Sequence, residues 1–247
     1  MQPHIHLEEN LAVANAILPG DPARVERIAA YLDNVESLGM NREYRAISGS
    51  YRGVRILAMS TGMGGPSMAI AVEELRRIGV SRMIRIGSCG ALQSGIGIGE
   101  LIIAQAAVRD EGTSAAYAPR AYPAVSDAGL LFACREAAEK AGFKTHTGIV
   151  RSHDSFYVDN QREINETWSR RGVLASDMET APLLTVAGLR GVKALSILNN
   201  VVLWGGDTFD SINSYSAGES GCADGERNSI LLALETFAAL DKERVKK

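Results

Sequence analysis

The chain has 247 residues, 46% of them hydrophobic, and a formal net charge of −3. This length can bury a large core, and no Pro-, Gly- or Ser-rich linker divides the sequence, so we expect one domain over residues 1–247. Mixed charges give no basic face for nucleic acid or an anionic membrane, and no apolar run approaches the roughly 18 residues of a membrane span.

Two further features make a reducing cytoplasm the simplest location. The N-terminus lacks a basic segment followed by a hydrophobic one, so we expect no secretory signal. The three cysteines, Cys89, Cys134 and Cys222, have the spacing of neither a disulfide framework nor a zinc site. We therefore expect no bound metal.

Apolar runs rich in β-branched residues alternate with helical patterns, which is typical of an α/β sheet covered by helices on both faces. The segment Ile47–Leu57 combines alternating hydrophobicity with turn residues and predicts a hairpin, so we expect a mixed sheet. The expected strands are Ala12–Leu18, part of Tyr51–Ser60, Met83–Ile86, Leu101–Val108, Thr147–Val150 and Ala194–Asn199. The expected helices are Pro22–Tyr31, Pro66–Ile78, Ala128–Ala141, Glu179–Leu189 and Ala223–Leu240.

The turn between the first expected strand and helix indicates an anion site. Asp21 suits the N-cap, and Pro22 suits the first helical turn, where a missing N–H costs nothing. Gly20 allows the backbone to approach a ligand, and Arg24 adds positive charge one turn further in. An ordinary strand-to-helix connection is the alternative interpretation.

A second junction of arginine and glycine follows at residues 82–90. Arg85 interrupts an expected buried strand, where an unpaired charge would be costly. Its planar guanidinium could bind a phosphate through two parallel hydrogen bonds, with the hydroxyl and N–H of Ser88 beside it. The alternative is an arginine at the strand end that reaches solvent or a neighbouring carboxylate.

Six sequence blocks occur in order and are spread over most of the chain: Leu18–Pro22, Asn41–Tyr44, Ser60–Ser67, Arg85–Ala91, Asp154–Tyr157 and Asp177–Ala181. Together they resemble the nucleoside phosphorylase-I family, which includes uridine phosphorylases and bacterial purine nucleoside phosphorylases. The resemblance implies a three-layer αβα fold with a twisted mixed central sheet. It also implies phosphorolysis of a nucleoside to free base and pentose 1-phosphate, with inorganic phosphate as co-substrate and no cofactor.

For phosphate, the resemblance implies a site shared between two subunits. Gly20, Arg24, Arg85 and Ser88 would bind phosphate from one subunit, and Arg42 would reach in from its neighbour. Several guanidiniums around one dianion agree with this, because charge-assisted hydrogen bonds are the stronger ones. Taken alone, Arg42 could equally be a solvated surface charge.

For the sugar, the resemblance implies that Glu179 accepts the ribose hydroxyls and that Met178 packs on the ring. Without the resemblance, Glu179 could be an ordinary acidic residue at a helix start. His4 of the partner subunit would contact the 5′-hydroxyl, with His6 as the competing candidate. This chain has Asp177 where the family usually has glutamate, which is a conservative departure.

For the base, the resemblance implies that Phe156 stacks on the ring beside Cys89 and Gly90, while Asn160 and Arg162 read its polar edge. Uridine phosphorylases have glutamine at the position of Asn160, and the shorter asparagine departs from that pattern. An exposed polar helix start is the alternative for this segment. Cys89 could also be a nucleophile, but no histidine is tied to it, and a packed cysteine is the favoured interpretation.

Asn200 bears on the choice of substrate, which the sequence leaves open. Bacterial purine enzymes carry an aspartate at this position, and asparagine cannot deliver a proton at neutral pH. Uridine is therefore the favoured substrate, a 6-oxopurine nucleoside is the alternative, and the segment 201–207 matches neither subgroup. We expect Arg85, Glu179, Asn200 and Arg162 to carry the chemistry.

Three points depend on the resemblance as a whole. It implies a hexamer built from dimers that share active sites. A nucleosidase of the same superfamily is disfavoured, because water needs no cluster of guanidiniums. A catalytically inactive protein that binds nucleoside and phosphate is the alternative from another functional class, and it rests on the departures at Asn160, at Asp177 and in the segment 201–207.

Overall fold

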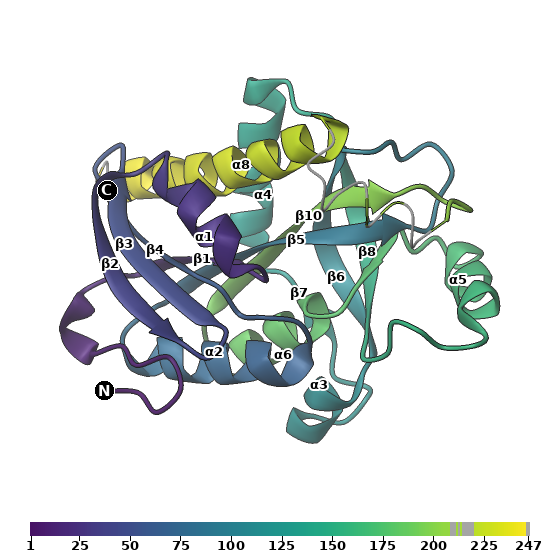
Figure 1. Ribbon diagram of the computed structural model, residues 1–247, viewed down its shortest axis with the longest axis horizontal. Coiled ribbons are helices and arrows are strands. Elements are labelled where there is room, and N and C mark those ends of the chain that lie inside the picture. The colour runs from purple at the N-terminus through teal and green to yellow at the C-terminus, as the bar shows by residue number, and fades with distance from the viewer. Residues whose placement is uncertain (208–210, 212, 214–219, 246–247) are drawn as a thin grey trace.

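The computed structural model describes residues 1–207, 211, 213 and 220–245. Within them, ten strands form one mixed sheet with helices on both faces (Figure 1). The strands are β1 (Asn15–Pro19), β2 (Asp33–Asn41), β3 (Tyr44–Tyr51), β4 (Val54–Met59), β5 (Arg82–Ala91), β6 (Leu101–Asp110), β7 (Ala124–Val125), β8 (Thr145–His153), β9 (Ala175–Asp177) and β10 (Lys193–Val202). The helices are α1 (Pro22–Ala29), α2 (Gly65–Arg77), α3 (Gly112–Tyr117), α4 (Ala128–Ala141), α5 (Gln161–Ser169), α6 (Thr180–Leu189) and α8 (Ser220–Val245), and a short 3-10 turn spans Glu9–Leu11.

The sheet has two parts that meet at β5. Its strand order is β10-β6-β8-β9-β5-β1-β4-β3-β2, and β10 also pairs with β5, so five strands close into a ring. The other part is the parallel set β5, β1 and β4, extended by the antiparallel strands β3 and β2. The expected mixed sheet is therefore confirmed.

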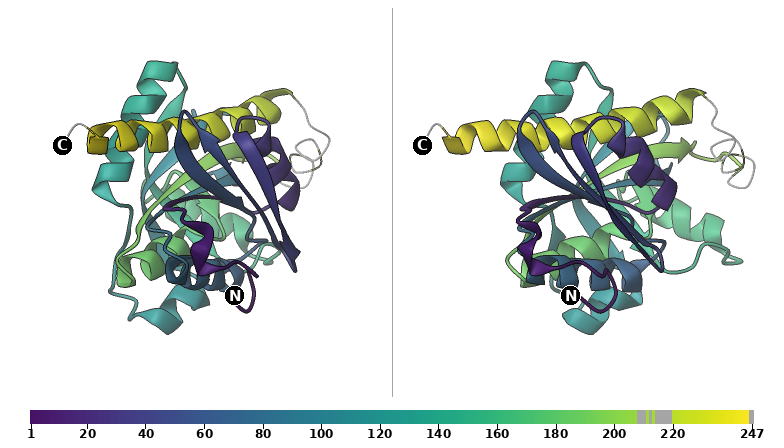
Figure 2. Two further views of the ribbon diagram at one scale, coloured as in Figure 1. Left: turned by 90° about the vertical axis from the view of Figure 1, so that its left-hand side faces the viewer. Right: turned by 60° about the vertical axis from the view of Figure 1, so that its left-hand side comes forward.

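Two core clusters lie on opposite sides of the sheet, as the alternation of side chains along a strand requires. In β5, Met83 belongs to the cluster that includes α2 and α6, whereas Ile84 belongs to the cluster that includes α1, α4 and α8. The turned views show α8 crossing one face and α2 with α6 covering the other (Figure 2). These layers confirm the three-layer αβα expectation.

The predicted hairpin is present as β3 and β4, with Arg52 and Gly53 at positive φ in its turn. The helix expected over Pro22–Tyr31 ends two residues earlier, and the expected C-terminal helix is longer at both ends. No helix of the described residues is long and apolar enough to cross a membrane.

Strand β2 and helices α3 and α5 were not expected from the sequence. Nearly all of β2 is exposed, so it lacks the alternation that marks a half-buried strand. Helix α5 buries none of its residues, and α3 has only six. Their sequences therefore carry little of the periodicity on which the prediction depends.

Candidate functional site

The glycine turn after β1 has the local structure that its sequence predicts. Asp21 is the N-cap of α1 and accepts a hydrogen bond from Ala23 N at 2.9 Å, with Pro22 in the first turn. A Cβ added to Gly20 would lie 3.1 Å from the carbonyl oxygen of Gly62, so this position favours glycine. The Gly62 N–H donates to the Gly20 carbonyl at 3.0 Å. The turns that follow β1 and β4 are thus joined.

Arg85 is the centre of a buried charged cluster. It lies two residues beyond Met83 and so points toward α6, and it is 3% exposed. Its Nε donates to Asp177 Oδ2 at 3.1 Å, and its Nη2 lies 2.5 Å from Glu179 Oε2. The carboxylate alternative considered for this arginine is therefore realised within the chain. Its Nη1, however, is buried with no hydrogen-bond partner among the described residues.

Asp177 anchors this cluster to the core. Its carboxylate accepts hydrogen bonds from the Ser152 hydroxyl at 2.6 Å and from the Thr180 hydroxyl at 2.6 Å, in addition to Arg85. The Thr180 amide adds a further bond at 3.0 Å. Four donors surround one carboxylate, so the position of Arg85 is fixed by β8, β9 and the first turn of α6.

Glu179 holds the N-cap position of α6, but its side chain does not cap that helix. Its Oε1 instead accepts a hydrogen bond from Gly64 N at 2.5 Å, in the turn before α2. Burial raises the pKa of Glu179 and the nearby Asp177 raises it further, while the Arg85 guanidinium opposes both. Glu179 is thus more than an acidic residue at a helix start, because it joins two loops and an arginine.

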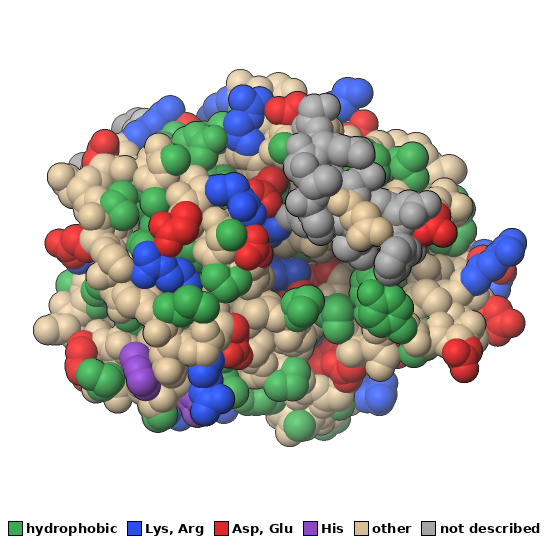
Figure 3. Space-filling model, viewed as in Figure 1, with side chains coloured by type: hydrophobic (Ala, Val, Ile, Leu, Met, Phe, Trp, Pro, Cys, Tyr) green, Lys and Arg blue, Asp and Glu red, His purple; other side chains and the backbone are tan. Residues whose placement is uncertain are grey.

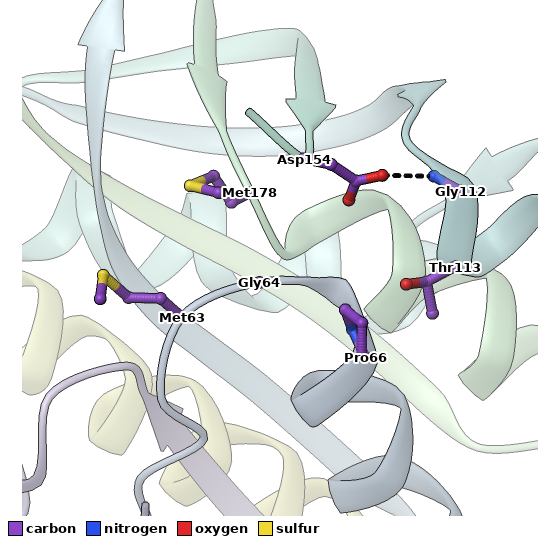
Figure 4. A pocket seen from close by; sticks show the side chains of 7 residues that line it. All are labelled: Met63, Gly64, Pro66, Gly112, Thr113, Asp154 and Met178. Carbon is purple, nitrogen blue, oxygen red and sulfur yellow. Dashed lines mark hydrogen bonds between the residues drawn. The ribbon is translucent and has the colours of Figure 1, made fainter. Parts of the chain in front are cut away.

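An open cleft of about 560 Å³ adjoins this cluster, since it is lined by Gly64, which donates to Glu179, and by Met178. Figure 4 shows the residues that line it. The space-filling view shows a hollow near the centre of the same face, with charged side chains visible at its bottom (Figure 3). Its volume is in the range of small-molecule sites. Across the cleft, Asp154 Oδ2 accepts a hydrogen bond from Gly112 N at 2.7 Å. The lining residues are Met63, Gly64, Pro66, Gly112, Thr113, Asp154 and Met178.

Arg24 and Ser88 flank the end of β5. Arg24 is 5% exposed, and its Nη1 donates to the Ile86 carbonyl at 3.1 Å. Its Nε donates to Glu226 Oε2 of α8 at 2.8 Å. Ser88 is half-buried two residues beyond Ile86. Gly20 and Arg24 therefore lie near the ends of β1 and β5, with Ser88 further along β5, and phosphate binding by these residues stays a prediction.

His4 and Arg42 are close to each other, at the turn between β2 and β3. Asn41 Nδ2 donates to the His4 carbonyl at 2.7 Å, and Arg42 is exposed with φ of +52°. His4 Nδ1 lies 2.6 Å from Glu74 Oε1 on α2. Neither residue is among the cleft-lining residues of its own chain. Their shared surface position fits the prediction that both serve a neighbouring subunit, and that prediction stays untested.

Three of the predicted base-site residues lie at the exposed start of α5 or in the segment just before it. Phe156 is 37% exposed and forms an edge-to-face pair with Tyr157 at 5.0 Å. Asn160 is the N-cap residue and makes no side-chain cap. The Arg162 side chain is 92% exposed, and its Nε donates to Glu166 Oε1 at 3.0 Å. This is the exposed helix start that was the alternative interpretation, and base reading by these residues stays a prediction.

Asn200 and Cys89 are buried in the ring of strands. Asn200 Nδ2 donates to the Gly97 carbonyl at 3.0 Å, whereas its Oδ1 is buried without a partner among the described residues. Cys89 is buried, and burial raises the pKa of its thiol far above the ordinary value. A thiol is the poorer nucleophile in this state, which favours the packed interpretation of Cys89.

Sequence reasoning did not identify several residues of this site. Asp154 and Gly64 belong to the matching blocks, so their positions in the sequence were a usable signal. Thr113 lies on the unexpected helix α3, and Glu226 acts from a helix 202 residues away from Arg24. Nothing near Arg24 in the sequence indicates its pairing with Glu226.

Comparisons with known proteins agree on one family. A family model described as the phosphorylase superfamily matches residues 15–204. The uridine phosphorylase of Thermococcus kodakarensis is 44% identical over 78% of this chain and 74% of that protein. A guanosine phosphorylase of Halorubrum lacusprofundi is 41% identical over 79% of this chain and 81% of that protein. The crystal structure of uridine phosphorylase from Vibrio fischeri has a TM-score of 0.90 and 47% identity, covering 96% of this chain and 97% of that one.

Proposed function

We propose that this chain, which belongs to the phosphorylase superfamily, cleaves a nucleoside with inorganic phosphate and takes uridine as its favoured substrate. A phosphate oxygen attacks the anomeric carbon of the pentose, and the bond from that carbon to the base nitrogen breaks. The bonding electron pair leaves with the base, which then takes a proton. The products are the free base and a pentose 1-phosphate, with no cofactor involved.

The observation that carries this proposal is the pairing of Arg85 with Glu179 beneath the cleft at 2.5 Å. Glu179 would accept the sugar hydroxyls, and Met178 beside it would pack on the ring. Because the pKa of Glu179 is raised, its ionised form depends on Arg85. Arg85 thereby holds the acceptor of the sugar in place while its Nη1 is available to phosphate.

The charges explain why phosphate needs more than one arginine. With both carboxyls ionised, the cluster of Arg85, Asp177 and Glu179 carries one net negative charge, which repels a dianion. Because Arg24 on α1 is itself paired with Glu226, Arg42 from a neighbouring subunit would supply the missing positive charge. We therefore propose a dimer that shares its active sites and a hexamer built from such dimers.

Uridine is favoured over purine nucleosides for two reasons. Asn200 cannot donate the proton that the aspartate of bacterial purine enzymes would donate from this position, and several similar relatives are uridine phosphorylases. A 6-oxopurine nucleoside is the second candidate, which the similarity to a guanosine phosphorylase supports. Three buried cysteines, Cys89, Cys134 and Cys222, fit a salvage enzyme of the reducing cytoplasm.

The direct test is a screen of the purified protein with uridine, thymidine, inosine, guanosine and adenosine, each with and without phosphate. We expect release of free base only with phosphate, fastest from uridine. Base release that is independent of phosphate would indicate a nucleosidase. Binding of uridine and phosphate without any release would indicate the inactive binding protein. Dilution into monomers should abolish activity if the sites are shared.

A further inference from the structure

A second buried arginine has a guanidinium nitrogen without a partner. Arg151 in β8 is 4% exposed, and its Nε donates to Asp110 Oδ2 at 2.7 Å. Its Nη1 is buried and makes no hydrogen bond within the described residues. The hydroxyl oxygen of Ser176 in β9 is also buried and unpartnered. Native proteins rarely bury such atoms unsatisfied, so two of them on adjacent strands point to a ligand.

The register of the strands places these two residues on one row with a predicted base-site residue. Arg151 is the neighbour of Ser176 in the parallel pair β8–β9, and Ser176 is opposite Gly90 in the antiparallel pair β9–β5. Side chains at paired positions point to the same side of a sheet. Arg151, Ser176 and Gly90 therefore share one side of three consecutive strands.

That side is also the side of Ser88, which lies two residues before Gly90 in β5. Asp177 follows Ser176 in β9 and points the opposite way, into the cluster with Arg85. On this side of β5, Ser88, which is predicted to bind phosphate, is followed by Gly90, which is predicted to lie at the base. Ser176 and then Arg151 continue the row outward from Gly90 across β9 and β8.

An ordinary structural arginine of this fold looks different. Arg109 in β6 is also buried, at 8% exposure, but all of its nitrogens donate to oxygens of the chain. Arg151 has one carboxylate partner at Nε and a free, buried Nη1. The acceptors of Arg109 are the Ser114 hydroxyl and the carbonyls of Ser114, Ala118, Pro119 and Tyr122.

We propose, building on the proposed function, that Arg151 and Ser176 select a base carrying an oxo group next to a ring N–H over one carrying an amino group. A guanidinium only donates hydrogen bonds, so Nη1 can pair with a carbonyl oxygen but not with an exocyclic amino group. The Ser176 hydroxyl accepts the neighbouring ring N–H. Uracil and the 6-oxopurines present this pair of groups, whereas cytosine and adenine do not.

The test compares uridine with cytidine in the phosphorolysis assay, using the wild type and the variants Arg151→Gln and Ser176→Ala. Two control variants match them. Arg190→Gln removes an arginine that also donates through Nε to one carboxylate, at 2.8 Å from Glu73, but lies on the surface. Thr185→Val removes another buried, unpartnered hydroxyl, which lies on α6.

We expect Arg151→Gln to lower kcat/KM for uridine by about 10- to 100-fold with little change for cytidine, because only the oxo base loses a charge-assisted bond. Ser176→Ala should lower kcat/KM for uridine by about 3- to 10-fold, again with little change for cytidine. Both controls should keep the wild-type ratio. Calorimetric titration with uracil and cytosine gives the same comparison without turnover.

An unchanged uridine-to-cytidine preference in folded Arg151→Gln and Ser176→Ala would overturn this inference. If Arg151→Gln does not fold by circular dichroism, the smaller Ser176→Ala change decides alone. A wild type that releases no base in phosphate would instead refute the proposed function itself. An active wild type, with variants that keep its uridine-to-cytidine preference, would leave that function intact and refute only the selection by Arg151 and Ser176.

Discussion

The cluster of Arg85, Asp177 and Glu179 and the start of α5 differ in how firmly the fold holds them. The three clustered residues are 3 to 5% exposed and are bonded to three separate strands and loops. Asn160 and Arg162 are exposed, and the hydrogen bond that Arg162 Nε makes is to its own helix. The firmly held residues are those proposed for the sugar and phosphate, which every nucleoside substrate shares. The exposed residues are proposed for the base, which differs between substrates.

Sugar and phosphate are common to all nucleosides, so the residues proposed for them can be fixed by the core. The base varies, and two of the residues proposed to read it, Asn160 and Arg162, lie at the start of a helix that buries none of its own residues. The same segment carries the departure from the uridine phosphorylase pattern at Asn160. We infer that base choice can change here without disturbing the core, whereas changes at Arg85 or Glu179 affect every substrate.

The largest effect is expected for Glu179→Gln, which tests the buried cluster of Arg85, Asp177 and Glu179. The amide loses the charge that pairs with Arg85 and presents an N–H₂ group where the sugar hydroxyls need an acceptor. We expect kcat/KM to fall by about 10²- to 10³-fold for uridine and inosine alike. Glu163→Gln, on exposed α5, is the control and should be silent. Activity retained by the Glu179 variant would remove it from the sugar site.

Next in size is Asp177→Asn, which should lower stability. The amide side chain could not accept from all four donors that now surround the carboxylate, and its own N–H₂ would face some of them. We expect a loss of about 3 kcal/mol in the free energy of unfolding, or roughly 10 °C in Tm. Calorimetry of this variant beside Asp159→Asn, an exposed control, measures the difference. Equal melting temperatures would contradict the anchoring role.

The fold could be predicted where local chemistry and periodicity agreed. The start of α1 was evident from Asp21 and Pro22, and the hairpin from its turn residues, because capping and turn geometry depend on a few adjacent side chains. Strand β2 could not be predicted, since its exposed residues follow no alternation and its existence depends on pairing with β3. Helix α5 could not be predicted either, because it buries none of its residues.

The site could be predicted in its types of residue but not in its pairings. Arg85 and Glu179 were expected to serve phosphate and sugar separately, yet the structure joins them directly at 2.5 Å. The bond from Arg24 to Glu226 is equally non-local. Which carboxylate meets which arginine depends on how β5, α6 and α8 pack, and a single sequence does not contain that information in its local patterns.

A smaller, selective effect is expected for Arg162→Ala on the exposed side. If Arg162 turns from Glu166 to a bound uracil, its removal should lower kcat/KM for uridine by about tenfold and leave inosine nearly unchanged. Arg170→Ala is a matched control, because Arg170 lies within 3.9 Å of the same Glu166 at the other end of α5. Equal losses for the two nucleosides would show that Arg162 does not read uracil.

The smallest effect concerns Glu74, which is buried like Asp177 but bonds to His4, a half-buried residue near the N-terminus. Its carboxylate accepts from Ile5 N at 2.9 Å and His4 N at 3.0 Å, and it pairs with the His4 ring at 2.6 Å. Burial alone would raise the pKa of Glu74, but these bonds outweigh it and lower the pKa. The ionised form therefore stabilises the folded chain, fully so at pH values above the usual glutamate pKa.

This stabilisation is lost as the pH falls through the lowered pKa of Glu74, because protonation then removes the charge in the folded state as well. Glu74→Gln should cost about 1 kcal/mol at pH 7 and progressively less below about pH 4. Thermal melts of the wild type and Glu74→Gln, at pH 7 and below about pH 4, measure this difference in stability. A difference that persists or grows in acid would mean that charge on Glu74 does not hold His4. A neutral-pH loss with unchanged uridine turnover would show that His4 serves stability rather than the sugar of a neighbouring subunit.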